Sequence, residues 1–427
     1  MSSTTPDLDL AAIRQDFPLL ADRPDGTRAI YLDSAATSQR PRAVIDAEVD
    51  FLRTANAAVH RGAHTLAAEA TEFFEDARAT VAGFVGADPD QLVWTSGATA
   101  GLNLVAYAIG NATAGRGLPA SARFALQPGD ELVVTETEHH ANLLPWQELA
   151  ARTGAVLRHI AVHDDGTLDL ESAASVIGPR TRVVAFPHVS NVLGIVNPVV
   201  ALVEMARDAE ALTVLDACQS APHLPLDLPT LDVDLAVFSG HKMLGPYAIG
   251  GLYGRADVLA DLPPFLVGGS MITRVGLGES EYLPPPQRFE AGTQPVSQAI
   301  GLAAAVRYLD GIGMGAVHAH EVRLERRMRE GLRSLPGIRL LGDAEGADRV
   351  ALCAFEVEGV HAHDAGQFLD ARGISVRVGH HCAQPLHRRF GMTATVRASA
   401  AVYNTDDEID ELLNAVSGIR GFFGAGA

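Results

Sequence analysis

The residues best suited to chemistry stand just after an apolar run in the middle of the chain. Residues 235–238 form a short apolar run that predicts a buried strand. Ser239 and Gly240 interrupt the run, and His241 and Lys242 follow. An ammonium group buried without a partner is costly, unless the lysine is bound as a Schiff base to an aldehyde cofactor. A surface lysine in a turn is the alternative, and the rest of the chain decides between the two.

A second candidate is the thiol of Cys382, in the segment Arg377-Val-Gly-His-His-Cys-Ala. This loop is polar, contains a glycine and places Cys382 beside His380 and His381. Such neighbours favour the thiolate, which is the nucleophilic form of cysteine. A buried structural cysteine is one alternative. Zinc bound by the two histidines, Cys382 and His387 is another, although adjacent ligands are poorly spaced for one tetrahedral ion.

The composition limits the class of protein. The chain has 427 residues, of which 47% are hydrophobic and 20% are charged, and this suits a large core divided between two domains. A formal net charge of −19 argues against nucleic acid or an anionic membrane as a main partner. The three cysteines are too widely spaced for a disulfide framework, so we expect a reducing compartment. Cys218 and Cys353 lie in apolar runs and are interpreted as structural.

The sequence predicts neither a signal peptide nor a membrane-spanning segment. The first residues lack the basic and apolar regions of a signal peptide. No uncharged apolar run is long enough to span a bilayer. We therefore expect a cytoplasmic protein.

Strands and helices alternate from residue 130 onward. The segments predicted, in order, are strand 132–135, helix 146–153, strand 183–186, helix 200–211, and strands 213–216 and 235–238. This alternation predicts a mainly parallel sheet, which binds ligands outside the carboxyl ends of its strands. The polar residues expected at those ends are His139, His140, Asn191, Asp216, Gln219, Ser239, His241 and Lys242. Four strands that all end in polar groups indicate a site.

Together these groups predict a pocket for pyridoxal phosphate. Asp216 would keep the pyridine nitrogen protonated, although an Asp after a strand is also a usual helix N-cap. His139 would stack on the ring, or would only be a histidine at a helix start. The strand, turn and helix start at residues 91–101 provide amides for a phosphate group, which is a weak signal by itself. Lys242 would form the Schiff base.

The ends of the chain complete the domain organisation. The other segments predicted before the sheet are helix 8–20, strand 29–36, helices 41–54 and 65–83, and an exposed insertion at 111–121. Beyond residue 313 the pattern becomes that of a smaller α+β domain, which closes with a helix that follows a capping box at residues 405–408. We predict an N-terminal helical segment over 1–30 that packs with the small domain, a large domain over 31–312 and a small domain over 313–427.

Several segments match one enzyme family nearly from end to end. They are Tyr31-Leu-Asp-Ser-Ala-Ala, Ala58-Val-His-Arg-Gly, Glu138-His-His-Ala-Asn, Ser190-Asn-Val-Leu-Gly, Ser239-Gly-His-Lys, Arg288-Phe-Glu-Ala-Gly-Thr, Arg377-Val-Gly-His-His-Cys-Ala, Arg397-Ala-Ser and Tyr403-Asn-Thr. The chain resembles the SufS-type (group II) cysteine desulfurases of the class V aminotransferase superfamily, which have the pyridoxal phosphate fold type I. The cysteine segment is specific, because it separates this type from relatives with a longer, mobile cysteine loop. The resemblance implies an α/β fold: a large domain with a mainly parallel sheet, and a smaller α+β C-terminal domain that carries this loop.

The resemblance also implies a role for individual residues. The residues implied to bind the cofactor phosphate are Ala98, Thr99, Ser239, His241 and, from the second subunit of a homodimer, Thr293. His139 would stack on the ring of the cofactor, and Asp216 would contact the ring nitrogen. Gln219 would face the hydroxyl group of the cofactor, and Lys242 would bind its aldehyde. The residues implied to bind the substrate are Asn191, Arg397, His60 and Arg377, and Cys382 is the implied nucleophile. Two departures are Ala100, where the family usually has Glu, and Tyr247, where it has a smaller residue.

The function implied by the resemblance is conversion of L-cysteine to L-alanine, with a persulfide on Cys382 that passes to a sulfur acceptor for iron–sulfur cluster assembly. Selenocysteine lyase activity, a transaminase or lyase without desulfurase activity, and a zinc-binding scaffold are the alternatives. The resemblance includes His363, and it favours a SufU-like, zinc-bearing acceptor over a zinc-free, SufE-like one. His363 would then bind the zinc of that partner, whereas no metal of the chain's own is expected. Otherwise His363 or Asp364 serves only the first turn of a helix.

Overall fold

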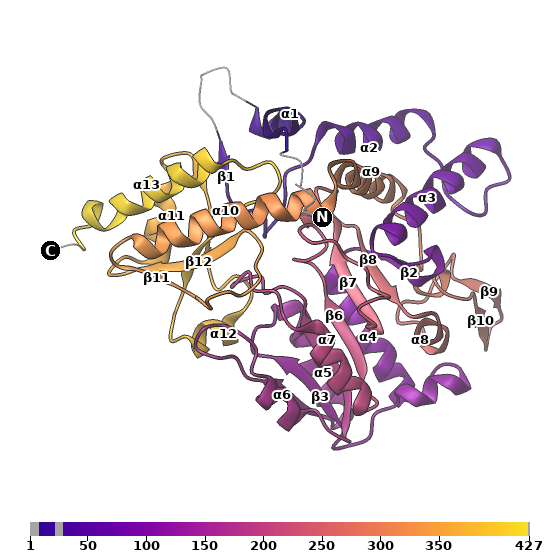
Figure 1. Cartoon of the computed structure of the whole chain (residues 1–427). Helices are drawn as coiled ribbons and strands as arrows, with labels where there is room; N and C mark the ends of the chain where they lie inside the picture. The colour runs from indigo at the N-terminus through magenta and orange to yellow at the C-terminus, as the bar shows by residue number, and fades with distance from the viewer. Residues whose placement is uncertain (1–7, 22–28, 426–427) are drawn as a thin grey trace, which may run out of the picture.

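Two β-sheets organise the chain. The computed structural model describes residues 8–21 and 29–425 (Figure 1). The segment on which the expectation about a signal peptide rests, residues 1–7, lies outside the described residues. The C-terminal part, orange to yellow in Figure 1, gathers on one side of the molecule around the smaller sheet.

The larger sheet has seven strands in the order β2-β8-β7-β6-β5-β3-β4. Their bounds are β2 (Leu92–Thr95), β3 (Glu131–Thr135), β4 (Val156–Ile160), β5 (Thr181–Pro187), β6 (Leu212–Asp216), β7 (Leu235–Ser239) and β8 (Gly250–Gly254). The strands from β7 to β4 run parallel, whereas β8 is antiparallel to both β7 and β2. The predicted mainly parallel sheet is confirmed. The strand β8 was not predicted from the sequence, because its glycines have low strand propensity.

Helices cover both faces of this sheet. Alternate residues of β7 belong to different apolar clusters. Ala236 and Phe238 pack with the set of helices on one face of the sheet, and Leu235 and Val237 pack with the set on the other face. The first set comprises α3 (Thr65–Phe84), α7 (Val199–Asp208) and α9 (Val296–Ile312), and the second α4 (Ala98–Thr113), α5 (Leu144–Thr153) and α8 (Ala256–Asp261). Alternate side chains of a strand point to opposite faces, so a sheet covered on both sides needs uniformly apolar strands. This explains the apolar run that precedes Lys242.

The smaller sheet is antiparallel and has the order β11-β12-β15-β14. Its strands are β11 (Ile338–Leu340), β12 (Leu352–Val357), β14 (Arg377–Gly379) and β15 (Thr395–Ser399), and the helices that share its core are α10 (Met314–Ser334), α11 (Ala362–Asp370) and α13 (Asp406–Phe422). The predicted capping box is present at the start of α13. Thr405 Oγ1 accepts from the Glu408 amide at 3.3 Å, and Glu408 Oε2 accepts from the Thr405 amide at 3.1 Å.

The N-terminal residues join the smaller sheet to the rest of the chain. The strand β1 (Ile30–Tyr31) pairs in parallel with β13 (Ile374–Ser375). Arg14, in α1 (Leu10–Gln15), forms an ion pair with Glu408 at 2.8 Å. These contacts join the described part of the N-terminal segment to the smaller sheet, and the predicted domain organisation stays a prediction.

Some elements differ from those predicted. The opening helix is interrupted, because Pro18 follows α1 and starts a separate turn. The strand expected at 29–36 is reduced to β1. The strand β4 and the helix α6 (Leu170–Val176) were not predicted. The insertion at 111–121 is anchored rather than wholly exposed, since Ser121 is buried and its hydroxyl donates to the Asp261 carbonyl at 2.6 Å.

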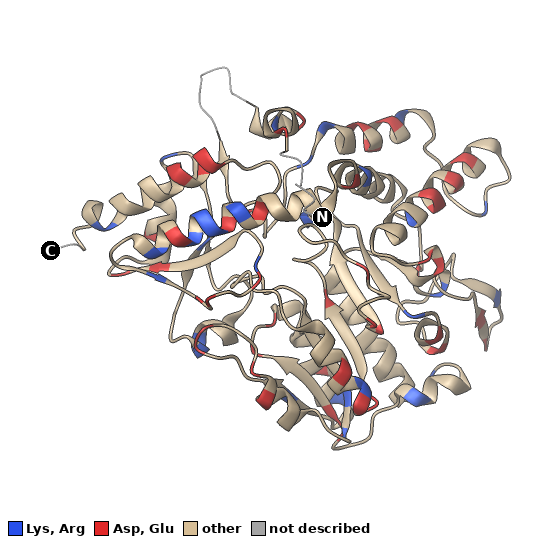
Figure 2. Ribbon diagram, viewed as in Figure 1, with Lys and Arg blue, Asp and Glu red and all other residues tan. Residues whose placement is uncertain are grey.

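The remaining helices and strands are α2 (Arg42–Thr54), α12 (Gln384–Arg389) and the hairpin β9 (Ile272–Val275) with β10 (Ser280–Tyr282). Charged side chains lie mainly on the helices, and the central strands carry few of them (Figure 2). Within the described residues, no single helix is long and apolar enough to cross a membrane. Only α9 and α10 taken together meet the criterion of length and composition, and they meet at an angle of 78°.

Candidate active site

A cavity of about 240 Å³ lies where the parallel strands of the larger sheet end. It is also lined by the loop after β14 and by β15 of the smaller sheet. The predicted site residues that line it are Ala98, Thr99, His139, Asn191, Asp216, Gln219, Ser239, His241, Lys242, Arg377, Cys382 and Arg397. These residues come from distant parts of the chain, and the fold brings them to one place.

The turn that carries Lys242 is held from the N-terminal part of the chain. Three donors converge on the carbonyl oxygen of His241: the Ser38 amide at 2.9 Å, the Ser38 hydroxyl at 3.1 Å and the Thr37 hydroxyl at 3.0 Å. Lys242 itself is half-buried and lines the cavity. These bonds fix the backbone beside the lysine, so its amine reaches the cavity from a rigid base.

A helix start provides an anion site on one side of the cavity. Gly97 precedes α4 with a φ of 136°, a conformation that side chains other than hydrogen rarely tolerate. A Cβ at Gly97 would also lie 3.3 Å from Ser239 Oγ. The Ala98 amide donates to Ser239 Oγ at 2.9 Å, which orients the serine at the first turn. Backbone amides at the start of a 16-residue helix attract a phosphate group.

Asp216 and Gln219 line the wall formed by the end of β6. Asp216 is buried, and its Oδ1 accepts from the Cys218 amide at 2.9 Å. Gln219 donates to the Ala35 carbonyl at 2.9 Å, while its buried Oε1 has no partner within the described structure. A buried amide oxygen without a partner is costly, and it fits a ligand that donates to it.

His139 is held as an uncharged side chain. Its Nδ1 accepts from the Ala141 amide at 3.0 Å. Burial, and then the charge of Lys242, lower the pKa of His139 to about 4. At neutral pH a neutral imidazole therefore lines the cavity.

Arg397 is buried, and one of its guanidinium nitrogens has no hydrogen-bond partner among the described residues. Its Nη1 donates to the Asn191 carbonyl at 2.9 Å, and its Nη2 donates to Asp33 Oδ1 at 3.3 Å. Its Nε is buried and has no partner among the described residues. Burial lowers the pKa of Arg397 to about 10 and raises that of Asp33. An arginine anchored in this way suits a carboxylate ligand.

The loop of Cys382 is strained and firmly attached. His381 and Cys382 have φ values of 50° and 58°, in the left-handed region that residues other than glycine seldom adopt. The His140 amide donates to the Cys382 carbonyl at 2.6 Å, and the Asn191 side chain donates to the His381 carbonyl at 2.6 Å. The Gln384 amide donates to His140 Nε2 at 3.1 Å. These bonds present the Cys382 thiol to the cavity.

Asn191 also supports the cysteine loop, and its predicted contact with a substrate stays a prediction. One hydrogen of its amide is used by the His381 carbonyl, so only the second is left for a substrate. It also contributes its backbone carbonyl to the support of Arg397.

The residues present fit pyridoxal phosphate. The cavity holds a lysine for the aldehyde, a helix start for the phosphate group and a buried carboxylate for the pyridine nitrogen. Two buried atoms without partners, Gln219 Oε1 and His241 Nδ1, are left to bind a polar ligand. Lys242, Asp216 and the start of α4 would hold the cofactor.

Three predicted site residues do not line this cavity. His60 Nε2 instead contacts Glu75 Oε1 at 2.8 Å. Thr293 and His363 are exposed, and each borders another depression of the surface. Within a single chain, therefore, none of the three reaches the candidate site.

The zinc alternative for the cysteine loop has no geometric support. His387 and His381 both direct Nε2 at the Thr395 hydroxyl, at 3.0 and 2.9 Å. In the part of the chain that the structure describes, no group of three or more His, Cys, Asp or Glu side chains is arranged to hold a metal ion.

Two other residues of the site, Asp33 and Cys218, were not identified from the sequence, and of these only Cys218 lines the cavity. Asp33 supports Arg397 from 364 positions away, and only its place in the Tyr31-Leu-Asp segment gave a signal. Cys218 was interpreted as structural, but it lines the cavity, and burial raises the pKa of its thiol well above the usual range. It therefore stays protonated, with Sγ 3.8 Å from Ser239 Oγ.

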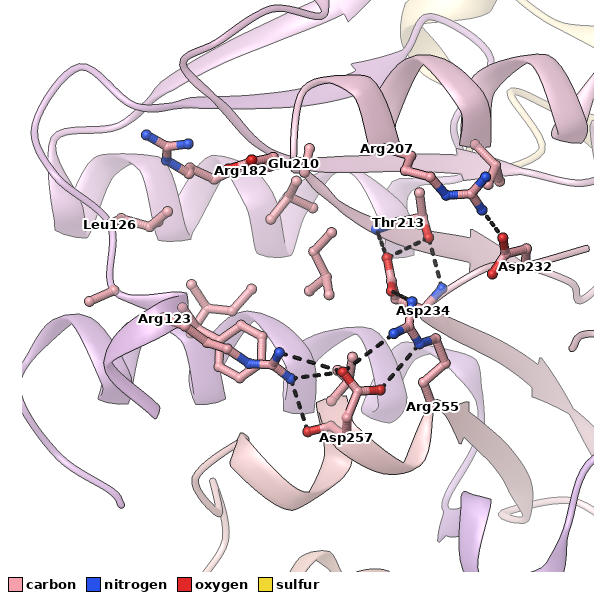
Figure 3. A pocket seen from close by; sticks show the side chains of 18 residues that line it. Arg123, Leu126, Arg182, Arg207, Glu210, Thr213, Asp232, Asp234, Arg255 and Asp257 are labelled. Carbon is pink, nitrogen blue, oxygen red and sulfur yellow. Dashed lines mark hydrogen bonds and ion pairs between the residues drawn. The ribbon is translucent and has the colours of Figure 1, made fainter. Parts of the chain in front are cut away.

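A larger cavity, of about 350 Å³, lies at the opposite end of the sheet, beside the amino ends of the strands (Figure 3). Its guanidinium groups face carboxylates: Arg123 contacts Asp257 at 3.3 Å, and Arg255 contacts Asp234 at 3.1 Å. None of its lining residues is a lysine, a cysteine or a histidine. The reactive groups are thus in the smaller cavity.

Comparison with known proteins agrees with this site. Residues 30–412 match the family model described as "Aminotransferase class-V". The chain is 55% identical over 427 residues to "Probable cysteine desulfurase 2" of Mycobacterium leprae, with 99% of each chain covered. Among solved structures it resembles the apo cysteine desulfurase of Thermococcus onnurineus NA1, with a TM-score of 0.88, 38% identity, and 98% and 99% of the two chains covered.

A third similarity concerns the cofactor. A C-DES variant with glycine covalently linked to its PLP cofactor matches with a TM-score of 0.79 and 26% identity, and 97% of this chain and 99% of that one are covered. The residues that line the cavity of this chain fit the same cofactor. The chain belongs to the aminotransferase class-V family and, within it, to the cysteine desulfurases.

Proposed function

We propose that this chain converts L-cysteine to L-alanine and keeps the sulfur as a persulfide on Cys382. The observation that carries the proposal is that Cys382 and Lys242 line one cavity of about 240 Å³. A transaminase needs the lysine but has no use for a thiol at this place. The strained, firmly held loop of Cys382 is a cost that a packing cysteine would not need.

The first half of the reaction falls to Lys242 and its neighbours. Pyridoxal phosphate, when bound, supplies an aldehyde for the amino group of the substrate and a ring that takes up electrons released at Cα. Lys242 removes the Cα proton as a general base. Asp216 would hold the proton of the ring nitrogen, and His139 would offer the ring a neutral side chain.

The substrate carboxylate is bound by Arg397. The unpartnered Nε of its buried guanidinium would donate a charge-assisted hydrogen bond to this carboxylate. Asn191 adds its second amide hydrogen, and Arg377 adds a further positive charge at the cavity wall. Together they orient the thiol of the substrate toward the loop of Cys382.

The second half belongs to Cys382. Its thiolate attacks the sulfur of the substrate, so a sulfur–sulfur bond forms as the bond between Cβ and sulfur breaks. The electron pair of the broken bond stays with the carbon skeleton, which takes up a proton equivalent to the one that the Cys382 thiol lost and leaves as L-alanine. The products are therefore alanine and a Cys382 persulfide.

The test is alanine formation from L-cysteine by the purified, cofactor-loaded protein in the presence of a thiol reductant. We expect alanine and sulfide in equal amounts. Cys382→Ser should bind L-cysteine, which shifts the absorbance of the cofactor, yet form neither alanine nor persulfide. Cys353→Ala, at a buried cysteine outside the cavity, is the matched control and should retain activity. Alanine formation by Cys382→Ser at the normal rate would contradict the assignment and favour another lyase or transaminase reaction.

We also propose the finer assignments: a SufS-type enzyme of the cytoplasm that works in iron–sulfur cluster assembly. The unpaired state of all three cysteines suits a reducing compartment. A homodimer is supported by exposed apolar side chains around the β9–β10 hairpin, namely Leu266, Val267, Val275, Leu277 and Tyr282. In such a dimer the exposed Thr293 would complete the phosphate site of the second subunit.

The proposed sulfur acceptor is a SufU-like protein that carries zinc. His363 is exposed in the first turn of α11, and it borders a groove of about 320 Å³ together with Val378 of β14. The same strand leads into the loop of Cys382. An exposed imidazole there is available as a zinc ligand for a docked partner.

A further inference from the structure

The protons in the hydrogen-bond chain behind the cysteine loop can be assigned from the contacts alone. His387 Nδ1 lies 3.0 Å from the Ala383 carbonyl, which only accepts, so Nδ1 carries the hydrogen. His387 Nε2, which is then bare, accepts from the Thr395 hydroxyl at 3.0 Å. Since the Thr395 hydrogen is used, its oxygen accepts from His381 Nε2 at 2.9 Å. His381 is therefore the Nε2–H tautomer, and its Nδ1 is a bare acceptor.

This acceptor is buried beside the nucleophile without a partner. His381 is only 4% exposed, lines the cavity and immediately precedes Cys382. Its Nδ1 has no hydrogen-bond partner in the described structure. Burial, and then the charge of Arg397, lower the pKa of His381 to about 2, so the ring stays neutral at physiological pH. A buried acceptor of this kind calls for a donor from a ligand.

We propose that His381 Nδ1 accepts a hydrogen bond from the thiol group of the substrate, an inference that rests on the proposed desulfurase function. The other polar groups of L-cysteine have partners elsewhere: the amino group goes to the cofactor at Lys242, and the carboxylate goes to Arg397. Only the S–H donor is left, and its sulfur must approach Cys382. The acceptor next to Cys382 is in the right place to hold that sulfur.

The bond fits the sulfur transfer step. The Cys382 thiolate attacks the sulfur of the substrate, the bond between Cβ and sulfur breaks, and its electron pair stays with the carbon skeleton. The hydrogen of the substrate thiol remains on the transferred sulfur, which becomes the terminal S–H of the persulfide. His381 Nδ1 thus accepts this hydrogen up to the moment of transfer, and no further reactant is needed.

The same contact discriminates between sulfur and selenium. A thiol with an ordinary pKa near 8.5 keeps its hydrogen at neutral pH. A selenol is more acidic, and it is ionised under these conditions. A selenolate has no hydrogen to donate to His381 Nδ1, and its negative charge is repelled by the lone pair of that nitrogen. His381 therefore favours cysteine over selenocysteine.

The test compares two variants that both tolerate the left-handed backbone at this position. His381→Gly removes the acceptor without adding strain, and His381→Asn keeps an acceptor oxygen close to the place of Nδ1. In a Cys382→Ser background, which stops turnover, the affinities for L-cysteine and L-alanine are measured from the absorbance of the bound cofactor. We expect the preference for cysteine over alanine to fall about fivefold in His381→Gly, the size of one hydrogen bond, and to be restored in His381→Asn.

A second arm uses turnover with Cys382 intact. In His381→Gly, kcat/KM for L-cysteine should fall while kcat/KM for L-selenocysteine is retained or rises. Equal losses for both substrates, or an unchanged preference for cysteine over alanine, would overturn the proposal and leave His381 a role in loop structure only. If His381→Gly does not fold, Thr395→Val is the second variant. It removes the oxygen that accepts the Nε2 hydrogen of His381, so the bare Nδ1 is no longer enforced. The preference for cysteine over alanine should then fall in the same way. A wild-type protein that makes no alanine from cysteine would refute the desulfurase function, whereas the affinity ratio still tests recognition of the thiol.

Discussion

At the scale of the residue, burial holds His188 and the cavity residue His381 in their neutral form. For His188 burial alone lowers the pKa to about 4, and for His381 burial and the Arg397 charge lower it to about 2. A neutral imidazole ring has one nitrogen that donates a hydrogen bond and one that accepts a hydrogen bond. The residues that bear chemistry were largely predictable, because a lysine, a carboxylate and a cysteine in such places are unusual. Partners such as Asp33 were not, since the pairing with Arg397 exists only in the folded chain.

The buried histidines predict a loss of stability in mild acid. The unfolded chain takes up a proton at each histidine below about pH 6.5, whereas the folded chain keeps His188 and His381 neutral. The stabilising effect is therefore complete above pH 6.5 and is lost as the pH falls toward the folded pKa. Between pH 7.5 and 5.5 the free energy of unfolding should fall by about 1.3 kcal/mol for each of the two.

Denaturant unfolding at pH 7.5 and 5.5, with saturating pyridoxal phosphate, measures this effect. In His188→Gln the difference between the two pH values should be smaller by the contribution of one histidine. An identical pH dependence in wild type and variant would contradict the prediction, because it would show that His188 takes up a proton in the folded chain as readily as in the unfolded chain.

At the scale of the element, the loop of Cys382 is held by the segment that presents His139. The residue after His139, His140, uses both its backbone amide and its ring to bind the loop, at 2.6 and 3.1 Å. One short segment therefore positions both His139, which is proposed to contact the cofactor ring, and the nucleophile Cys382. The sequence predicted the elements on each side of the site, because strands that are apolar throughout and amphipathic helices leave clear patterns. It did not predict this connection, because hydrogen bonds between loops leave no periodic signal.

Loss of the His140 ring should loosen the cysteine loop. His140→Ala keeps the amide bond to Cys382 but removes the acceptor for the Gln384 amide. We expect Cys382 to react about fivefold faster with iodoacetamide, which corresponds to one hydrogen bond. His380→Ala is the matched control, because it removes a neighbouring exposed imidazole for which no bond to the loop is described. Equal acceleration in the two variants would mean that the ring of His140 does not hold the loop.

At the scale of the whole molecule, two sheets meet around one cavity. The larger sheet contributes the lysine side of the site, and the smaller sheet contributes Arg397 and the loop of Cys382. The division into an α/β part and an α+β part followed from the change of pattern near residue 313. The pairing of β1 with β13 could not be foreseen, because two strands of two residues each are too short to show a period.

The proposed acceptor should act through His363. With a zinc-loaded SufU-like protein, the low basal rate of alanine formation should rise strongly in wild type. His363→Ala should lose this stimulation and keep the basal rate supported by a chemical reductant, because the residue lies outside the catalytic cavity. His159→Ala, at an exposed histidine on β4, should respond like wild type. Full stimulation of His363→Ala, or stimulation by a zinc-free acceptor alone, would contradict the assignment.

The pairing of β1 with β13 has a consequence for biosynthesis. A ribosome makes Ile30 and Tyr31 about 340 residues before their partners Ile374 and Ser375. At ordinary rates of translation the first strand therefore waits roughly 20 to 70 seconds with an unpaired edge. A transcript interrupted before its last segment would yield a chain that lacks Cys382 and also leaves its opening strand open to aggregation. Only complete translation protects the beginning of this protein.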